Sequence, residues 1–416
     1  MLLVGGILAV AFNMRAAITS LPPVYPELSV AAGLSPATES LLAAVPVLSF
    51  AVFSALAAGL ARRFGEERVI GLALVLLAAG LGLRSLAPGA LLFPGTIIAS
   101  CAIALMNVLL PSLIKRRRPD QVGLLIGLYL MSLTAGAVLG AAIAVPVFTA
   151  AGGSGVAVRL TLGMWALPAL IAAFVWFPQH RLRTMPGPAG PSAEPQPEAA
   201  DPAGAGAVGP PLPVRQRGVV AMGRHALAWQ VAAFMGLQSL SYYATLSWFP
   251  TLLRDHGLSA VQAGDLLALT NVGNAVTGLL VPMLAHRMRD QRAIAAVAVL
   301  VIIAGLAGVG FGPPGAATEF MLVLGLGQGA AFGLAVFLFT ARAADGAAAA
   351  SLSGFAQSTG YLVATAGPLL IGLLHTATGG WTAPVWVLLV VAVGQLAAGL
   401  LAGRPKTISI GQPAPA

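Results

Sequence analysis

Charged residues are scarce in this chain, and acidic ones are the scarcest. Only 8% of the 416 residues are charged, with 13 acidic side chains against 22 basic ones, whereas 58% are hydrophobic. A soluble protein of this length would need far more charge on its surface. The single cysteine, Cys101, lies in an apolar stretch, so no internal disulfide can form. We therefore expect a membrane protein rather than two or three soluble domains.

The apolar stretches also lack the residue patterns of a catalytic centre. They contain no His-x-x-x-His, no Glu-x-x-His and no paired carboxylates, which metal or acid–base chemistry would need. No selectivity loop of the kind that channels use is visible. The net charge of +9 does not indicate nucleic-acid binding, because the arginines lie in short loops between apolar runs. We expect no enzyme activity, no metal or other cofactor, and no nucleic-acid partner.

Twelve apolar runs, bounded by charge, proline or glycine, are long enough to cross a bilayer as helices. They cover residues 2–26, 37–61, 68–87, 90–114, 121–149, 157–178, 225–253, 260–285, 293–312, 318–341, 347–375 and 382–403. Between the sixth and seventh runs, the segment from Pro186 to Pro213 is rich in proline, alanine and glycine and cannot bury a core. We predict an all-α membrane protein with a six-helix bundle at 1–178, a disordered cytoplasmic linker at 179–224, a second six-helix bundle at 225–403 and a cytoplasmic tail at 404–416.

Basic residues in alternate loops predict the orientation. The even-numbered runs are followed by Arg62, Arg63, Arg68, Lys115, Arg116, Arg117, Arg118, Arg181, Arg183, Arg215, Arg217, Arg224, Arg287, Arg289, Arg292, Arg342, Arg404 and Lys406. The other loops hold only Arg159 and Arg254. Because basic loops remain in the cytoplasm, both termini are predicted to lie there. The heavy use of arginine, alanine and glycine favours a bacterial source, and hence the inner membrane of a bacterium.

The two sets of six runs are similar to each other. A shift of 224 residues aligns Pro26–Arg68 with Pro250–Arg292 without a gap, with 14 identities in 43 positions. Ser35, followed by Pro36, has the residues of a helix start, and Ser259 with Gln262 forms the pattern of a capping box at the equivalent place. A six-plus-six parallel repeat is the plan of major facilitator transporters, in which the substrate binds near the bilayer midplane between the halves.

Several stretches resemble a narrower group within that superfamily. Residues Asn13–Ser20 read Asn-Met-Arg-Ala-Ala-Ile-Thr-Ser, which resembles the Asn-x-Arg-x-Ala-x-Thr-Ser opening of the cyanate transporter family. That family also includes nitroimidazole transporters. The other similar stretches are Leu60–Gly65, Asn107–Pro111 leading to Lys115, and Gly236–Ser239 leading to Tyr243 and Trp248–Pro250. The resemblance implies a transporter of small molecules that works by alternating access.

The loop after the second run departs from the superfamily pattern. Arg62 stands where that pattern has an aspartate, and Glu66 and Glu67 replace a basic pair, so that the reversed signs can still pair. Arg62, Arg63 and Arg287 are the candidate gating-loop residues. The fifth run lacks the Gly-Pro-rich signature of many drug–proton antiporters, because Gly136 and Gly140 flank Ala-Val-Leu. We interpret the pairs Gly136/Gly140 and Gly325/Gly329 as sites where helices pack closely.

Arg15 is the main candidate for substrate binding. It stands in the middle of an apolar run, where a guanidinium costs about 2.5–3.5 kcal/mol to insert. We expect no intramembrane carboxylate of the first half to serve as its partner. Its fork of donors suits planar oxyanions, so we predict that Arg15 binds an anionic or nitro-like group of the substrate. The alternative is a structural arginine bonded to backbone carbonyls or to Asn107.

Further polar side chains at similar depth are predicted to line the same cavity. The seventh run presents Gln238, Ser241, Tyr242 and Thr245 on one helical face, which should turn toward protein or water. Hydrogen bonding between helices is the alternative role for each candidate. Besides Arg15, the candidate substrate-binding residues are Asn13, Thr19, Asn107, Tyr129, Gln238, Tyr242, Tyr243, Asn271, Asn274, Gln328, Gln357 and Tyr361.

These features predict a secondary active or facilitative transporter of a small anion or small polar nitrogenous compound. Asp265, two turns into the eighth run, is a possible proton-coupling residue, and a solvated residue near a helix N-terminus is its alternative role. Efflux of hydrophobic compounds by proton antiport and a sensor that binds without transport are the alternative functions. The expected partners are the small-molecule substrate and the lipid bilayer, and we expect a monomer.

Overall fold

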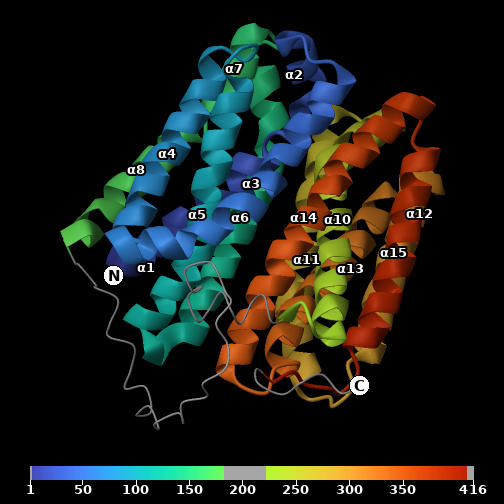
Figure 1. Ribbon diagram of the computed structural model, residues 1–416. Helices are drawn as coiled ribbons and strands as arrows, with labels where there is room; N and C mark the ends of the chain where they lie inside the picture. The colour runs from blue at the N-terminus through green and yellow to red at the C-terminus, as the bar shows by residue number, and fades with distance from the viewer. Residues whose placement is uncertain (1, 182–221, 410–416) are drawn as a thin grey trace, which may run out of the picture.

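The computed structural model describes residues 2–181 and 222–409, and these are almost entirely helical (Figure 1). The first half contains α1 (Leu2–Thr19), η1 (Pro22–Val24), α2 (Tyr25–Ala32), α3 (Pro36–Phe64), α4 (Glu66–Leu86), α5 (Leu92–Arg117), η2 (Pro119–Gln121), α6 (Val122–Ala150), α7 (Gly155–Gly163), α8 (Ala166–Trp176) and η3 (Phe177–Arg181). The second half contains α10 (Ala226–Asp255), α11 (Ala260–His286), α12 (Arg292–Phe311), η4 (Pro314–Ala316), α13 (Ala317–Ala341), α14 (Gly346–Thr378) and α15 (Thr382–Ala402).

The predicted helical membrane fold is confirmed. Eleven helical segments in the described part of the chain are long and apolar enough to cross a membrane. The seventh predicted run forms α10, which is 30 residues long, carries the predicted polar stripe and is not among these eleven. Most of the predicted linker lies outside the described residues, and the division of the chain into domains stays a prediction.

Two predicted spans are broken rather than continuous. The first run ends as α1 at Thr19 and continues through η1 into α2, because Pro22 and Pro23 lack the backbone N–H of a continuing helix. Gly33, whose φ is +63°, ends α2 in the left-handed conformation that glycine adopts without strain. The sixth run likewise divides into α7 and α8.

The predicted helix starts are confirmed at the equivalent places in the two halves. The Ser35 hydroxyl accepts a hydrogen bond from the backbone N–H of Thr38, and Pro36 is the first residue of α3. Ser259 and Gln262 form a complete capping box at the start of α11, with each side chain bonded to the other's backbone.

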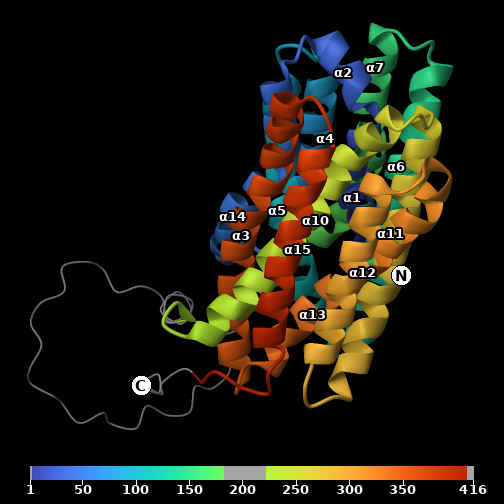
Figure 2. The ribbon, with the colours of Figure 1, turned by 90° about the vertical axis from the view of Figure 1, so that its right-hand side faces the viewer.

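Each half packs mainly within itself, and the halves meet along two pairs of helices. In the first half α1 packs against α6 and α4 against α5, while in the second α11 packs against α13 and α10 against α14. Between the halves, α3 lies against α14 and α6 against α11 (Figures 1 and 2).

Close helix crossings recur at equivalent places in the two halves. A Cβ on Gly136 would collide with the backbone of Phe12, where α6 crosses α1. The 224-residue shift carries this pair to Gly360 and Gly236, which also lie backbone to backbone where α14 crosses α10. Gly140, Gly325 and Gly329 contact neighbouring helices in the same way, so the packing role predicted for these glycines is confirmed.

Candidate functional site

Arg15 points from the first half of the molecule into the second. Its Nη1 donates a hydrogen bond to the Tyr242 hydroxyl at 3.3 Å, and its Cζ lies 5.6 Å from the centre of the Tyr242 ring. The Tyr242 hydroxyl donates in turn to Oδ1 of Asn271 at 3.2 Å. Asn271 is held in place because its own amide donates to the backbone carbonyl of Leu267 at 2.9 Å. A short polar chain therefore connects α1, α10 and α11 across the interface of the two halves.

Arg15 keeps accessible surface although its helical neighbours are buried. Met14 and Ala16 have none, whereas Arg15 is partly exposed. Its side chain reaches Tyr242 in the other half, so the guanidinium lies at the interface of the two halves. Among the described residues Arg15 forms no ion pair. Glu39 is an acidic residue in the first turn of α3, and its carboxylate accepts a hydrogen bond from Ser29 and does not pair with Arg15.

Aromatic side chains surround the guanidinium. Tyr129, Tyr243 and Tyr361 lie close enough to interact with it electrostatically. The Phe50 ring lies 6.3 Å from that of Tyr243 and 6.1 Å from that of Tyr361. These residues come from α3 and α6 of the first half and from α10 and α14 of the second. The site is thus a single positive charge enclosed by neutral, electron-rich rings.

The polar stripe of α10 divides between two environments. Tyr242 turns to Arg15, whereas Gln238 donates to the backbone carbonyl of Gln328 at 3.3 Å. Gln328 donates to Thr245 Oγ1 at 3.0 Å and is fully buried. Gln238 and Gln328 therefore lie inside the second half, where they join α10 to α13, and the structure does not bring them to Arg15.

Two other residues of the opening motif form hydrogen bonds within the first half. Asn13 donates to the backbone carbonyls of Ala9 at 2.8 Å and Pro168 at 3.3 Å, so its side chain faces α8 and not the interface. Thr19 donates to the backbone carbonyl of Arg15 at 3.0 Å and has no accessible surface. The structure does not place either side chain beside the Arg15 guanidinium.

The remaining candidates are not joined to the Arg15 chain by hydrogen bonds. Asn107 and Asn274 are partly exposed, and in the part of the chain that the structure describes neither side chain has a hydrogen-bond partner. Gln357 donates to Ser353 in its own helix at 2.8 Å. Asp265 is exposed near the start of α11. The structure does not bring these four side chains into the hydrogen-bonded chain around Arg15.

Comparison with known proteins agrees with this architecture. The sequence profile described as the Major Facilitator Superfamily matches residues 7–368. The chain belongs to the major facilitator superfamily. It is 39% identical to the 2-nitroimidazole transporter of Escherichia coli strain K12, over 98% of this chain and 96% of that protein. It is 31% identical to the cyanate transport protein CynX of the same organism, over 89% of each chain.

Solved structures of this superfamily share the fold at low sequence identity. A mutant of the nucleoside transporter NupG superposes with a TM-score of 0.73 at 16% identity, covering 96% of this chain and 99% of that one. A D-xylose–proton symporter superposes with a TM-score of 0.69 at 17% identity, covering 98% and 99%. At these identities the comparison supports the fold and not the ligand.

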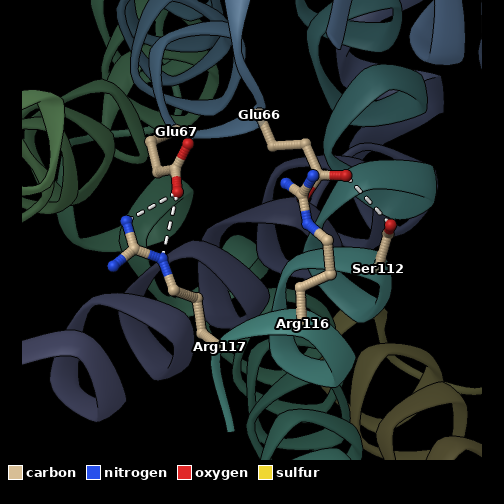
Figure 3. A network of polar contacts seen from close by, with 5 residues as sticks. All are labelled: Glu66, Glu67, Ser112, Arg116 and Arg117. Carbon is tan, nitrogen blue, oxygen red and sulfur yellow. Dashed lines mark hydrogen bonds and ion pairs between the residues drawn. The ribbon is translucent and has the colours of Figure 1, made fainter. Parts of the chain in front are cut away.

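Glu66 and Glu67, the acidic residues that replace the basic pair of the superfamily pattern, form ion pairs with arginines of α5 (Figure 3). Glu66, at the start of α4, lies 2.6 Å from Arg116 and accepts a hydrogen bond from Ser112 at 3.0 Å. Glu67 pairs with Arg117 at 2.7 Å. Sequence reasoning treated these arginines only as orientation signals. The pairs lie within the first half and fix α4 to α5.

Two of the predicted gating-loop arginines, Arg63 and Arg287, form no ion pair with another described side chain. Arg63 is exposed, with its guanidinium 5.2 Å from the centre of the Phe64 ring, and Arg287 is also exposed. The side chain of Arg62 is not among those that the structure describes. Among the described side chains, Arg116 and Arg117 supply the positive charges that pair with Glu66 and Glu67.

In the second half a neutral glutamine stands at the position equivalent to Glu67. The 224-residue shift carries Glu67 to Gln291, whose Oε1 accepts a hydrogen bond from the buried Arg342. Arg342 also donates to the last carbonyls of α15, those of Ala402 at 2.8 Å and Gly403 at 2.9 Å. Burial lowers the pKa of the Arg342 guanidinium, and nearby Asp290 opposes that shift. The arginine thus caps α15 without a carboxylate of its own.

Within the part of the chain that the structure describes, an ion pair joins the two halves, and sequence reasoning missed it. Arg254, at the end of α10, donates to both carboxylate oxygens of Glu27 in α2, at 2.7 and 3.0 Å. Beside this pair, the rings of Tyr25 and Trp248 lie 6.1 Å apart across the same interface. We call this the Glu27 end of the molecule, as opposed to the Glu66 end. The available signal was that Arg254 is one of few basic residues in the alternate loops.

Proposed function

We propose that this protein transports a small anion or a small polar nitrogenous compound, with Arg15 as its main contact. The observation that carries the proposal is a partly accessible guanidinium at the interface of the halves whose partners are all neutral. The five donors of a guanidinium match the paired oxygens of a carboxylate, nitrate or nitro group. A ligand of that kind would supply the negative charge that the surrounding protein does not.

The relatives support this substrate class. One is named for a nitroimidazole, a planar ring with a nitro group, and another for cyanate, a small anion. Both molecules place electron-rich atoms at one end, where Arg15 and the Tyr242 hydroxyl can donate hydrogen bonds. A planar heterocycle would in addition stack on the tyrosine rings around Arg15.

The contacts between the halves support transport by alternating access. Glu27–Arg254 and Tyr25–Trp248 close the interface at one end, and Arg15 lies in the last turns of α1, the helix that leads through η1 to that end. We infer that the Glu27 end faces the outside of a bacterial inner membrane, because the arginine-rich loops lie at the Glu66 end. The termini would then be cytoplasmic, with two six-helix domains joined at 179–224 rocking about the site.

Counterflow in proteoliposomes tests the proposal. Labelled 2-nitroimidazole or cyanate should accumulate in vesicles preloaded with the unlabelled compound. Arg15→Gln should lower the efficiency of exchange by roughly 10- to 100-fold, because a charge-assisted hydrogen bond contributes about 1.5–3 kcal/mol. Arg15→Lys keeps the charge without the planar fork and should be intermediate.

The control is Arg159→Gln, which removes an exposed arginine far from the site and should leave exchange unchanged. Exchange by Arg15→Gln at the rate and affinity of the unmodified protein would refute the role of Arg15. Binding without exchange by the unmodified protein would instead favour a sensor.

A further inference from the structure

Positive charge gathers at one corner of the second half, at the Glu66 end of the molecule. The exposed side chains come from the loop between α11 and α12, from the first residue of α12 and from the segment after α15, and they are Arg287, Arg289, Arg292, Arg404 and Lys406. We call these five residues the basic corner. In the described part of these segments the only carboxylate is that of Asp290, which lies 3.5 Å from Arg292. Five cations therefore face one carboxylate.

The two segments that form the basic corner are fixed to each other. Arg342 donates to Oε1 of Gln291 in the loop and to the carbonyl of Gly403 after α15. The backbone N–H of Gln291 donates to the same carbonyl at 3.1 Å, where α12 and α15 lie side by side (Figure 2). Further on, the backbone N–H of the buried Ile408 donates to the Arg342 carbonyl at 2.8 Å. Residues 404–407, which we call the strap, are thus held at both ends beside the loop.

The basic corner directly continues a surface that faces the acyl chains of the membrane. Arg287 lies one turn beyond Met283 and Leu284 of α11, which are 62% and 54% exposed. Val297, in the second turn of α12, is 61% exposed. Exposed apolar side chains of membrane-spanning helices contact lipid tails. A ligand with an anionic head and apolar tails would therefore match both parts of this surface.

The other half of the repeat shows that the basic corner is not a property of every loop at this end. The 224-residue shift aligns Arg289 with Gly65 and Gln291 with Glu67, so the second half has one more cation and one carboxylate fewer. In the first half both Glu66 and Glu67 pair with arginines of α5 (Figure 3). Basic residues that served only to orient the helices would act equally well in either half.

We propose that the basic corner binds the headgroup of one anionic phospholipid, whose acyl chains lie along α11 and α12. Arginine forks match the paired oxygens of a phosphate, and clusters of basic residues beside a membrane-spanning helix attract anionic lipids. The headgroup of a zwitterionic phospholipid carries its own cation, which the corner would repel. This lipid would remain at the edge of the second half and would not be a transported substrate.

Native mass spectrometry of the full-length protein in a neutral detergent tests the proposal. Phosphatidylglycerol should be retained more strongly than phosphatidylcholine. Arg404→Gln combined with Lys406→Gln should weaken retention of phosphatidylglycerol roughly 10- to 30-fold, since each basic side chain near an anionic headgroup contributes on the order of fivefold in affinity. Equal retention of the two lipids by the unmodified protein, or undiminished retention by this strap variant, overturns the proposal.

A matched variant distinguishes a site from general attraction. Arg68→Gln combined with Arg118→Gln removes two exposed cations from the first half at the same end and should leave retention unchanged. An equal loss in the two double variants would mean that the whole basic face attracts lipid, and overturns the site. Arg289→Gln leaves the strap intact and should weaken retention about fivefold by itself, so the test does not depend on the strap variant folding.

Thermal unfolding distinguishes a lipid from a soluble anion. Phosphatidylglycerol should raise the unfolding midpoint of the unmodified protein, because the lipid binds the folded state, and the rise should be smaller in the strap variant. Inorganic phosphate at the same concentration should produce no such rise. An equal rise with inorganic phosphate would assign the basic corner to a soluble anion and overturn the lipid.

Discussion

At the scale of single residues, the hydroxyl of Tyr242 is the most informative atom of the site. It accepts a hydrogen bond from Arg15 and donates one to Asn271, so that it fixes the guanidinium across the interface. Tyr242→Phe keeps the ring but removes both bonds. We expect a roughly tenfold rise in the KM for substrate exchange with little change in fold, since one buried hydrogen bond contributes about 0.5–1.5 kcal/mol.

A matched substitution at another tyrosine controls for loss of a hydroxyl. Tyr25 lies at the Glu27 end, where its ring packs against Trp248. Tyr25→Phe keeps that ring and should leave the KM for substrate exchange unchanged. If Tyr242→Phe binds substrate as well as the unmodified protein, the hydroxyl does not orient Arg15.

Residue patterns predicted part of this site for a clear reason. The cost of a charge in an apolar run identified Arg15, and helical periodicity identified Tyr242 as facing protein. Their contact joins positions 227 apart and depends on the rotation of two helices, which no local pattern contains. Asn13 shows the same limit, because two residues along a helix turn a side chain by about 200° from Arg15 and toward α8.

At the scale of helices, the crossing of α1 and α6 positions the guanidinium. Gly136 admits the backbone of Phe12, three residues before Arg15, and a Cβ there would collide with it. Gly136→Ala should therefore destabilise the protein by about 1–3 kcal/mol, as overpacking does, and lower the thermal unfolding midpoint. Gly127→Ala, in the same helix with open space around it, should be neutral or slightly stabilising. Equal midpoints for the two variants would contradict the role of the crossing.

The length of the apolar runs predicted that the helices exist, but it did not predict where a run is divided into two helices. Twelve runs predicted the helices, and the serine caps predicted where α3 and α11 start. The break after α1 requires Pro22 and Pro23 to be weighed against an otherwise apolar run. Apolar content alone favoured continuity, because the bilayer requires apolar side chains whether or not the backbone bends.

At the scale of the whole molecule, the sequence repeat predicted two similar halves but not how they meet. The loop arginines identified the Glu66 end, where each half is fixed within itself by Arg116 and Arg117 or by Arg342. The contact that joins the halves at the other end needs Glu27 and Arg254, 227 residues apart. A repeat compares each half with its copy and contains no information on contacts between them.

The Glu27–Arg254 pair should therefore bias the equilibrium between open and closed states of the Glu27 end. Both side chains are partly exposed, so the pair contributes about 1 kcal/mol at most, or about a fivefold change in population. Glu27→Gln should increase the fraction open at that end. Spin labels at Val30 and His256, in a Cys101→Ser background, should then report longer distances between the halves.

Charge reversal distinguishes an ion pair from a local effect of either residue. Glu27→Arg alone should open the Glu27 end further than Glu27→Gln, because two arginines repel, and adding Arg254→Glu should restore the closed distances. Glu319→Gln, an exposed carboxylate without an ion pair in the described structure, should leave the distances unchanged. If the double reversal stays open, the apolar contact of Tyr25 with Trp248, and not the charges, closes this end.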